Sequence, residues 1–167
     1  DKYGVSLAVE HLVARGRKNI YYIKDRDTDS AKAKRDGFLE AMRRNGLAFA
    51  DHVLEAGETL EDAIGAMQAL LAQGIVPDGI VCGEDLTAAG ALKALLRAGL
   101  RVPGQVAVVG FNNSDYAHLC EPVLTSVDNK PEQVALLCVQ LLESRIERSE
   151  AYSSVVLQPE LAQGETS

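Results

Sequence analysis

The sequence predicts an α/β fold in which a parallel sheet is covered by helices on both faces. Short apolar runs alternate along the chain with longer segments whose apolar residues recur at helical spacing. The run 106–111 is almost entirely apolar, which is typical of a strand buried on both faces of a parallel sheet. The 167 residues are enough for one domain with a single core.

The first half of the chain begins with a predicted helix over 5–14, where apolar residues recur at helical spacing and Gly16 marks the expected end. Residues 20–23 form a short apolar run bounded by charge, which predicts a buried strand, and 25–29 predict a polar loop. The same patterns predict three further elements: a helix over 30–45 ending at Gly46, a strand over 52–54, and a helix over 59–73 ending at Gly74.

The second half continues the alternation of strands and helices. The patterns predict strands over 79–82, 106–111, 124–127 and 155–157, and helices over 86–98 and 131–147. Asp85 is expected to cap the helix that follows it. Residues 149–154 are expected to form a loop, and 163–167 a frayed tail.

The charge of the chain argues against binding of nucleic acid by these 167 residues on their own. The formal net charge is −7, and an acidic protein needs a local basic patch before it attracts a phosphate backbone. We expect no binding of nucleic acid by this chain, because its basic residues are scattered among acids. Examples are Lys32, Lys34, Arg35, Arg43 and Arg44. No apolar run approaches 18 residues, so no membrane span is expected.

The cysteines indicate a cytoplasmic protein. Cys82, Cys120 and Cys138 have no CxxC spacing, and their odd number argues against a disulfide framework. His118 and Cys120 come nearest to a metal site, but two ligands do not make a zinc site. We therefore expect no metal and no cofactor.

Catalytic patterns are weak, and no enzyme is expected. The strongest candidate is Asp25-Arg26-Asp27-Thr28 after the first strand, because two carboxylates there would be able to hold Mg²⁺ and attack a phosphate. This stretch resembles the Asp-x-Asp motif of haloacid-dehalogenase-type phosphatases. The threonine stands one position early, and the later lysine and acidic motifs are missing, so a solvated charged loop is the simpler interpretation.

Four stretches together resemble one known family. They are EHLVARGRKNI over 10–20, Arg35-Asp36-Gly37-Phe38, PDGIVCGEDLTAAGAL over 77–92, and GLRVPGQVAVVGFNNSDYAHLCEPVLTSV over 99–127. They are similar to the patterns EHLxxxGHxxI, RxxGF, PDAIxxxND…AxGAL and GxxVPxxVAVVGFDD…PxLTTV of the lactose/galactose-repressor (LacI/GalR) family of bacterial transcription regulators. Their order and spacing cover nearly the whole chain.

The resemblance implies a periplasmic-binding-protein-like fold, in which two α/β lobes enclose a small-molecule effector. Members of the family carry a helix-turn-helix DNA-binding head and a first lobe ahead of the part that this chain, over 1–167, resembles. We therefore expect 1–16 and about 128–150 to pack on the first lobe. We also expect a homodimer that contacts operator DNA only through the head.

The resemblance also implies an effector site. It assigns effector binding to Arg35, Glu84 and Asn112, and less directly to Asp29 and Thr59. Open α/β sheets bind ligands beyond the carboxyl ends of their strands, and these side chains both donate and accept hydrogen bonds, as a sugar-like ligand requires. The family usually has asparagine at the position of Glu84 and aspartate at the position of Asn112. The exchange favours an unusual ligand, such as one with an amine near Glu84.

An extracytoplasmic sugar-binding protein of a transporter is the main alternative, because it shares the fold and the cleft. The stretches over 102–111 and 122–127 favour the regulator. The sequence leaves the effector, the operator and the sign of the response open.

Overall fold

In the computed structural model, the chain forms one six-stranded sheet in the order β2-β1-β3-β4-β5-β6. The strands from β2 to β5 in this order run parallel, and β6 pairs antiparallel with β5. The structure describes residues 1–148 and 154–167, so most of the loop predicted over 149–154 lies outside the described residues. The strands are β1 (Ile20–Lys24), β2 (Val53–Glu55), β3 (Gly79–Cys82), β4 (Ala107–Phe111), β5 (Thr125–Asp128) and β6 (Glu160–Ala162).

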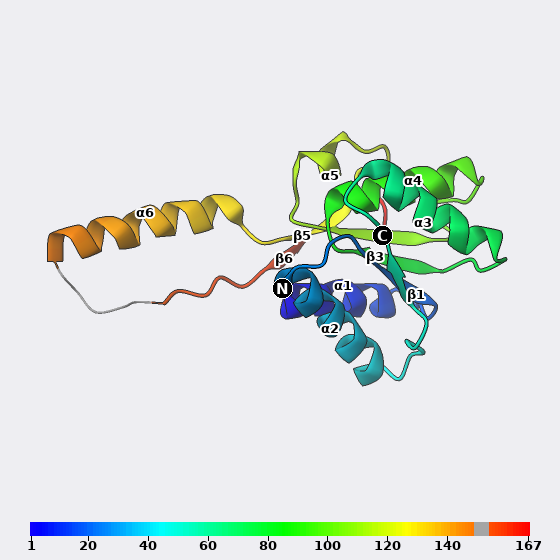
Figure 1. Ribbon diagram of the computed structural model, residues 1–167, viewed down its shortest axis with the longest axis horizontal. Helices are drawn as coiled ribbons and strands as arrows, with labels where there is room; N and C mark the ends of the chain where they lie inside the picture. Colours follow the sequence, from blue (N-terminus) through cyan, green and yellow to red (C-terminus); the bar gives the residue numbers. More distant parts are fainter. Residues whose placement is uncertain (149–153) are drawn as a thin grey trace.

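Helices cover both faces of the sheet (Figure 1). Helices α1 and α2 pack on one face, α3 and α4 pack on the other, and the short α5 lies beside α4. No helix in the described residues is long and apolar enough to cross a membrane. The helices are α1 (Lys2–Ala14), α2 (Asp29–Arg44), α3 (Leu60–Ala72), α4 (Asp85–Arg97), α5 (Asp115–Leu119) and α6 (Pro131–Arg148).

Local sequence determines where the helices begin and end. A capping box starts α3: the Asp62 N–H donates to Thr59 Oγ1 and the Thr59 N–H donates to Asp62 Oδ2, each at 3.1 Å. Gly16 and Gly46 follow α1 and α2 with φ of 81° and 68°, a conformation that glycine adopts without strain. The helix boundaries therefore lie close to the predicted ones.

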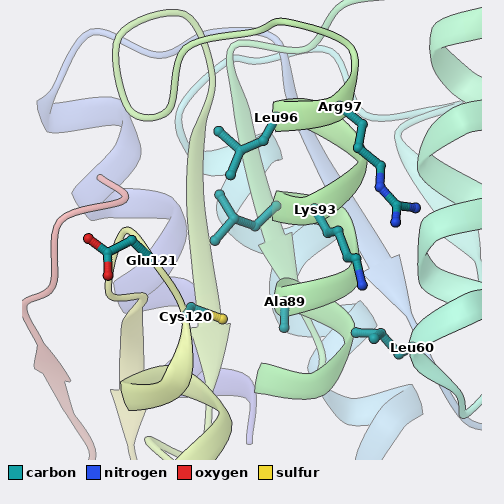
Figure 2. A pocket seen from close by; sticks show the side chains of 8 residues that line it. Leu60, Ala89, Lys93, Leu96, Arg97, Cys120 and Glu121 are labelled. Carbon is teal, nitrogen blue, oxygen red and sulfur yellow. The ribbon is translucent and has the colours of Figure 1, made fainter.

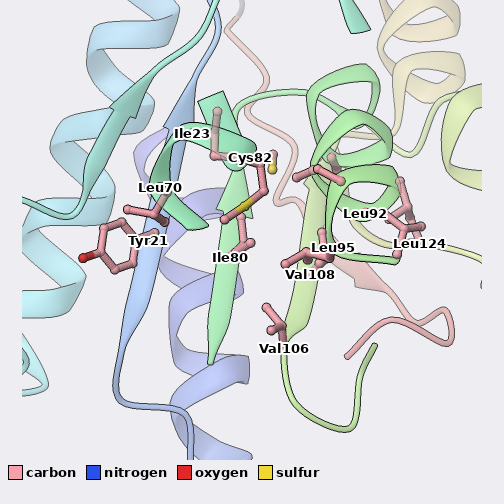
Figure 3. Close-up of a cluster of buried hydrophobic side chains, with 14 of the residues drawn as sticks. Tyr21, Ile23, Leu70, Ile80, Cys82, Leu92, Leu95, Val106, Val108 and Leu124 are labelled. Carbon is pink, nitrogen blue, oxygen red and sulfur yellow. The ribbon is translucent and has the colours of Figure 1, made fainter. Parts of the chain in front are cut away.

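Two aliphatic cores lie on opposite faces of the sheet. Side chains alternate along each strand, so Ile80 and Cys82 join the core under α3 and α4, while Val81 joins the core under α1 and α2. Figure 3 shows the first of these cores. Every residue of β1, β3 and β4 is buried, which confirms the parallel sheet covered on both faces.

Helix α1 packs within this lobe, which differs from the expectation that residues 1–16 pack on another lobe. Gly37 of α2 permits its close approach, because a Cβ at position 37 would lie 2.6 Å from the Lys2 carbonyl oxygen. The sequence pattern identifies an apolar face but does not identify what covers it. The fully buried residues of α1 are Val5, Ala8, Val9 and Leu12.

Helix α6 projects away from the rest of the molecule (Figure 1). Its apolar side chains remain open to solvent: Leu136 is 60% exposed, Leu142 61% and Ile146 75%. The described residues of this chain therefore leave the apolar face of α6 uncovered.

The end of the chain departs from the sequence prediction. The last strand is 160–162 rather than 155–157, and Val155 and Val156 are exposed. The segment 163–167 is ordered rather than frayed, because Thr166 inserts beside β4 and β5. Its Oγ1 donates to the Val108 carbonyl at 2.7 Å and accepts from the Thr125 N–H at 2.9 Å.

Candidate functional site

Polar residues gather at the carboxyl edge of the sheet, where β1, β3 and β4 end side by side. Asp25 follows β1, Glu84 follows β3, and Asn112 follows β4. Parallel pairing of β1 with β3 and of β3 with β4 carries these loops to one edge. This edge is where open α/β sheets bind their ligands.

Lys34 of α2 places a buried cation at this edge. Its side chain is buried, its Nζ donates to the Gly83 carbonyl at 2.9 Å, and it lies 4.2 Å from the centroid of the Phe111 ring. Burial lowers the pKa of this ammonium, while the charges of Asp25 and Glu84 act in the opposite direction. An ammonium has three donors, and this one uses a single donor in a hydrogen bond to the described residues.

Arg35 lies differently from what its assignment to the site requires. Its Nη2 and Nε both donate to Asp36 Oδ1, at 3.0 and 3.3 Å, and its side chain is 39% exposed. In the pattern RxxGF, the basic residue stands three positions before the glycine. Counting back from Gly37 gives Lys34, so the residue that matches the pattern is the neighbour of the one first assigned.

Glu84 is already engaged by a cation of this chain. Its Oε2 lies 3.3 Å from Arg26 Nη2, and the same guanidinium has its Nε 3.6 Å from Asp25 Oδ2 and 3.9 Å from Glu58 Oε2. The three carboxylates come from three different loops. Arg26 therefore links the loops after β1, β2 and β3.

Asn112 takes a left-handed conformation with φ of 96°, and its amide Oδ1 accepts from Asn129 Nδ2 at 3.1 Å. Its N–H donates to the Val127 carbonyl at 2.8 Å. The residue lines a polar cavity of about 670 Å³ that reaches the start of α6. The lining also includes Asn113, Asp128, Lys130, Glu132 and Glu160.

Asp29 and Thr59 both stand at helix starts. Asp29 is the first residue of α2 and its side chain is fully exposed, while the Thr59 side chain is used in the capping box of α3. Neither contributes to the buried group around Lys34.

Asp85 does not cap its own helix as expected. Helix α4 begins at Asp85, and Glu84 holds the capping position without a side-chain hydrogen bond. The Asp85 carboxylate instead accepts from the Ser114 N–H, the Ser114 hydroxyl and the Ser126 hydroxyl, at 2.7, 2.9 and 2.6 Å. Burial raises the pKa of this carboxyl, although these hydrogen bonds act in the opposite direction. The family pattern marks this position as aspartate, but the sequence does not reveal its partners.

Tyr22 completes the group at the edge. Its hydroxyl is buried and has no hydrogen-bond partner among the described residues. A Cβ at Gly83 would lie 2.6 Å from Asp25 Oδ1 and 3.1 Å from this hydroxyl, so the glycine leaves room for both. The edge thus offers donors, acceptors and an unpaired buried hydroxyl, which suits a ligand with many polar groups. The described residues contain no cluster of three or more His, Cys, Asp or Glu side chains that would hold a metal ion.

Comparison with known families gives a match over residues 9–167, to the model described as the periplasmic binding protein-like domain. The chain belongs to the periplasmic binding protein-like domain family. The order of strands and the helices on both faces agree with this match.

Relatives of this periplasmic binding protein-like domain include transcriptional regulators. The HTH-type transcriptional repressor PurR of Pasteurella multocida is 34% identical over 161 residues, which are 95% of this chain and 48% of PurR. The transcriptional regulator CelR, solved in complex with cellobiose, superposes with a TM-score of 0.87 at 29% identity, over 98% of this chain and 51% of CelR. A dimeric Lac repressor gives a TM-score of 0.91 at 25% identity, over 99% of this chain and 61% of the repressor.

These matches confirm the resemblance to the lactose/galactose-repressor family that the four sequence stretches indicate. The chain spans about half the length of PurR and of CelR. It thus corresponds to about half of each of these two regulators.

Proposed function

We propose that this chain is the ligand-sensing part of a transcription repressor of the lactose/galactose-repressor family. The observation that carries the proposal is the buried, incompletely bonded ammonium of Lys34 at the carboxyl edge of a periplasmic binding protein-like sheet. Relatives named as repressors support a regulator over a transport protein or a phosphatase. The chain senses its ligand without transforming it, and the protein works in the cytoplasm.

The ligand is small and polar, such as a sugar. Lys34 donates to it, Glu84 accepts from it, and Asn112 does both. Lys34 takes the role that the sequence assigns to Arg35, because the Arg35 guanidinium already donates to Asp36. A neighbour solved with cellobiose supports a carbohydrate as the ligand class. Arg26 already neutralises Glu84, so a neutral polyol fits as well as an amine.

The complete ligand site lies between two lobes. Helix α6 is the part of this chain that contacts the other lobe. The apolar face of α6, with Leu136, Leu142 and Ile146 exposed, needs a partner that excludes water. A first lobe packed on that face supplies it, and residues 128–130 then form one of the connections between the lobes.

The protein acts as a homodimer that meets its partner copy through α4 and the loop after α5. A largely apolar groove of about 470 Å³ runs along this surface (Figure 2). Lys93 and Arg97 lie along α4 and Glu121 lies across the groove. A two-fold axis places the basic side of one copy opposite the acidic side of the other. Contact with operator DNA comes from a helix-turn-helix head outside these residues, because the chain itself is acidic.

Titration calorimetry of the full-length protein against sugars, amino sugars and nucleosides tests the ligand site. Substituting Lys34 or Asn112 by alanine is expected to weaken binding of the best ligand at least about tenfold, because buried polar groups of the ligand lose their partners. Arg35→Ala is the matched control and is expected to bind nearly as wild type does. Binding that is insensitive to Lys34→Ala, or the absence of any polar ligand, would overturn the site.

Sedimentation of the full-length protein tests the dimer surface. Leu96 of α4 is 42% exposed, and Leu96→Glu is expected to yield monomers because it places a charge within the apolar contact. Val76, 49% exposed and outside α4, offers the control variant Val76→Glu. Equal effects of the two variants would argue against this surface.

A further inference from the structure

We propose that Asp85 is the positioning residue of the ligand site, because its buried carboxylate joins α4 to both the loop over 112–114 and strand β5. Asp85 is 1% exposed and does not itself line the polar cavity at Asn112. The consequence for ligand binding rests on the proposed function. The positioning of the loop rests on the contacts alone.

The carboxylate is held entirely by groups of other segments. Oδ2 accepts the N–H and the hydroxyl of Ser114, and Oδ1 accepts the hydroxyl of Ser126. No cation of the described residues lies within 4 Å of it, since none of the ion pairs includes Asp85. The hydrogen bonds from the serines offset the free-energy cost of burying the carboxylate only while the serines stay in place. The carboxylate therefore favours one conformation of the loop.

Ser126 connects Asp85 to Asn113, the neighbour of Asn112. Its Oγ donates to Asp85 and accepts the Asn113 N–H at 3.0 Å. Asn112 and Asn113 both have positive φ, at 96° and 50°, which few residues adopt without supporting contacts. The Asp85–Ser126–Asn113 chain of hydrogen bonds therefore supports the backbone that aims Asn112.

The same carboxylate also reaches toward the proposed dimer surface. Ser114 holds the N-cap position of α5, and its contact with Asp85 fixes how α5 lies beside α4. The loop that follows α5 contributes Cys120 and Glu121 to the groove along α4. One buried carboxylate thus connects the loop of Asn112 to the proposed dimer surface. We therefore expect ligand binding at Asn112 and dimer formation to influence each other.

Amide hydrogen exchange and amide chemical shifts of the 167-residue chain test the positioning. Asp85→Asn replaces charge-assisted hydrogen bonds by weaker neutral ones. Ser126→Ala removes both the donor to Asp85 Oδ1 and the acceptor for the Asn113 N–H, but leaves the two contacts of Ser114 with Asp85 Oδ2 in place. We expect Asp85→Asn to accelerate exchange at Ser114 about tenfold or more and to move its amide proton upfield. We expect Ser126→Ala to accelerate exchange at Asn113 while leaving Ser114 protected.

Asp78→Asn is the matched control. The Asp78 carboxylate also accepts two backbone N–H groups, those of Lys18 and Asn19, but it lies ahead of β3, at the other end of the strand. This variant is expected to affect Lys18 and Asn19 and to leave 112–114 unchanged. Uniform acceleration of exchange in every variant, or unchanged Asn113 and Ser114 amides in Asp85→Asn, would overturn the positioning.

Calorimetry of the full-length Asp85→Asn protein with the best ligand of the sugar and nucleoside panel separates the two proposals. A loss of affinity of about tenfold, with the ligand contacts themselves unaltered, supports Asp85 as a positioning residue. Wild-type affinity together with an altered 112–114 loop would overturn its link to the ligand site. Failure of the wild-type protein to bind any panel member would contradict the proposed function while leaving the exchange results for the loop intact.

Discussion

The backbone of Gly110 lies against the carboxylate of Asp85, so closely that a methyl group at position 110 would overlap Asp85 Oδ1. Strand β4 therefore contains a glycine where a buried strand otherwise favours a branched side chain. The small residue leaves space for the carboxylate against β4, next to Ser126 of the paired strand β5.

Gly110→Ala is expected to lower the free energy of unfolding by about 1–3 kcal/mol, because Asp85 has to leave its serine partners or the strand has to move. Urea unfolding followed by circular dichroism measures this change. Gly110→Ala in an Asp85→Ala background is the control and is expected to cost less, since the overlap is gone. Equal costs in the two backgrounds would show that the glycine and the carboxylate are independent.

Gly37→Ala is expected to destabilise the chain despite the higher helix propensity of alanine. The added Cβ would lie 2.6 Å from the Lys2 carbonyl oxygen and 2.8 Å from the Lys2 Cα, so α1 has to shift from α2. Gly65 of α3 has no atom within 4 Å of the corresponding position, and Gly65→Ala is expected to stabilise the chain by about 0.5–1 kcal/mol. Thermal unfolding of both variants measures the contrast, and a stabilising Gly37→Ala would contradict the close packing of α1.

The pH dependence of stability reports on Asp85. Burial raises the pKa of its carboxyl in the folded state above the unfolded value of about 3.9. Between these two values the folded state holds more protons than the unfolded state, so the contribution of this group to stability rises as the pH falls. The free energy of unfolding of wild type minus that of Asp85→Asn is expected to increase from pH 7 toward pH 4, as measured by urea titrations. A decrease over this range would mean that the folded state favours the ionised carboxyl.

Lys34→Met is expected to leave the stability of the chain within about 1 kcal/mol of wild type, because loss of the hydrogen bond to Gly83 is offset by removal of a buried charge. The variant is nonetheless expected to lose affinity for the polar ligand in the full-length protein. Lys32→Met, on the same helix with its side chain 49% exposed, is expected to change neither property. Severe unfolding of Lys34→Met would assign the lysine a structural role instead of a ligand-binding one.

Hydrophobic spacing predicts most of the fold because the pattern reports burial directly. The runs that became β1, β3 and β4 are buried on both faces, and the glycines after the helices mark their ends. The pattern failed at the end of the chain, where Val155 and Val156 are apolar but exposed, and the paired residues of β6 are mixed in polarity. The partner of α1 was also missed, because an apolar face alone does not specify what covers it.

The candidate site was predicted only in part. Glu84 and Asn112 lie at strand ends, which the topology of a parallel sheet places together. The pattern RxxGF, counted back from Gly37, selects Lys34 rather than the predicted Arg35. The two side chains point about 100° apart on α2, so a difference of one position decides which of them faces the edge of the sheet. Neither the three carboxylates around Arg26 nor the two serines around Asp85 leave any signal in sequence spacing, because they come from segments far apart in the chain.

Thr166 is synthesised after strands β4 and β5, to which it is hydrogen-bonded, and this order affects folding during translation. Its contacts with Val108 and Thr125 join positions 58 and 41 residues apart, and α6 lies between them in the chain. On the ribosome, β4 and β5 emerge well before the segment that completes their hydrogen bonds. A nascent chain interrupted within α6 leaves one edge of β5 unpaired, where it is open to pairing with another chain.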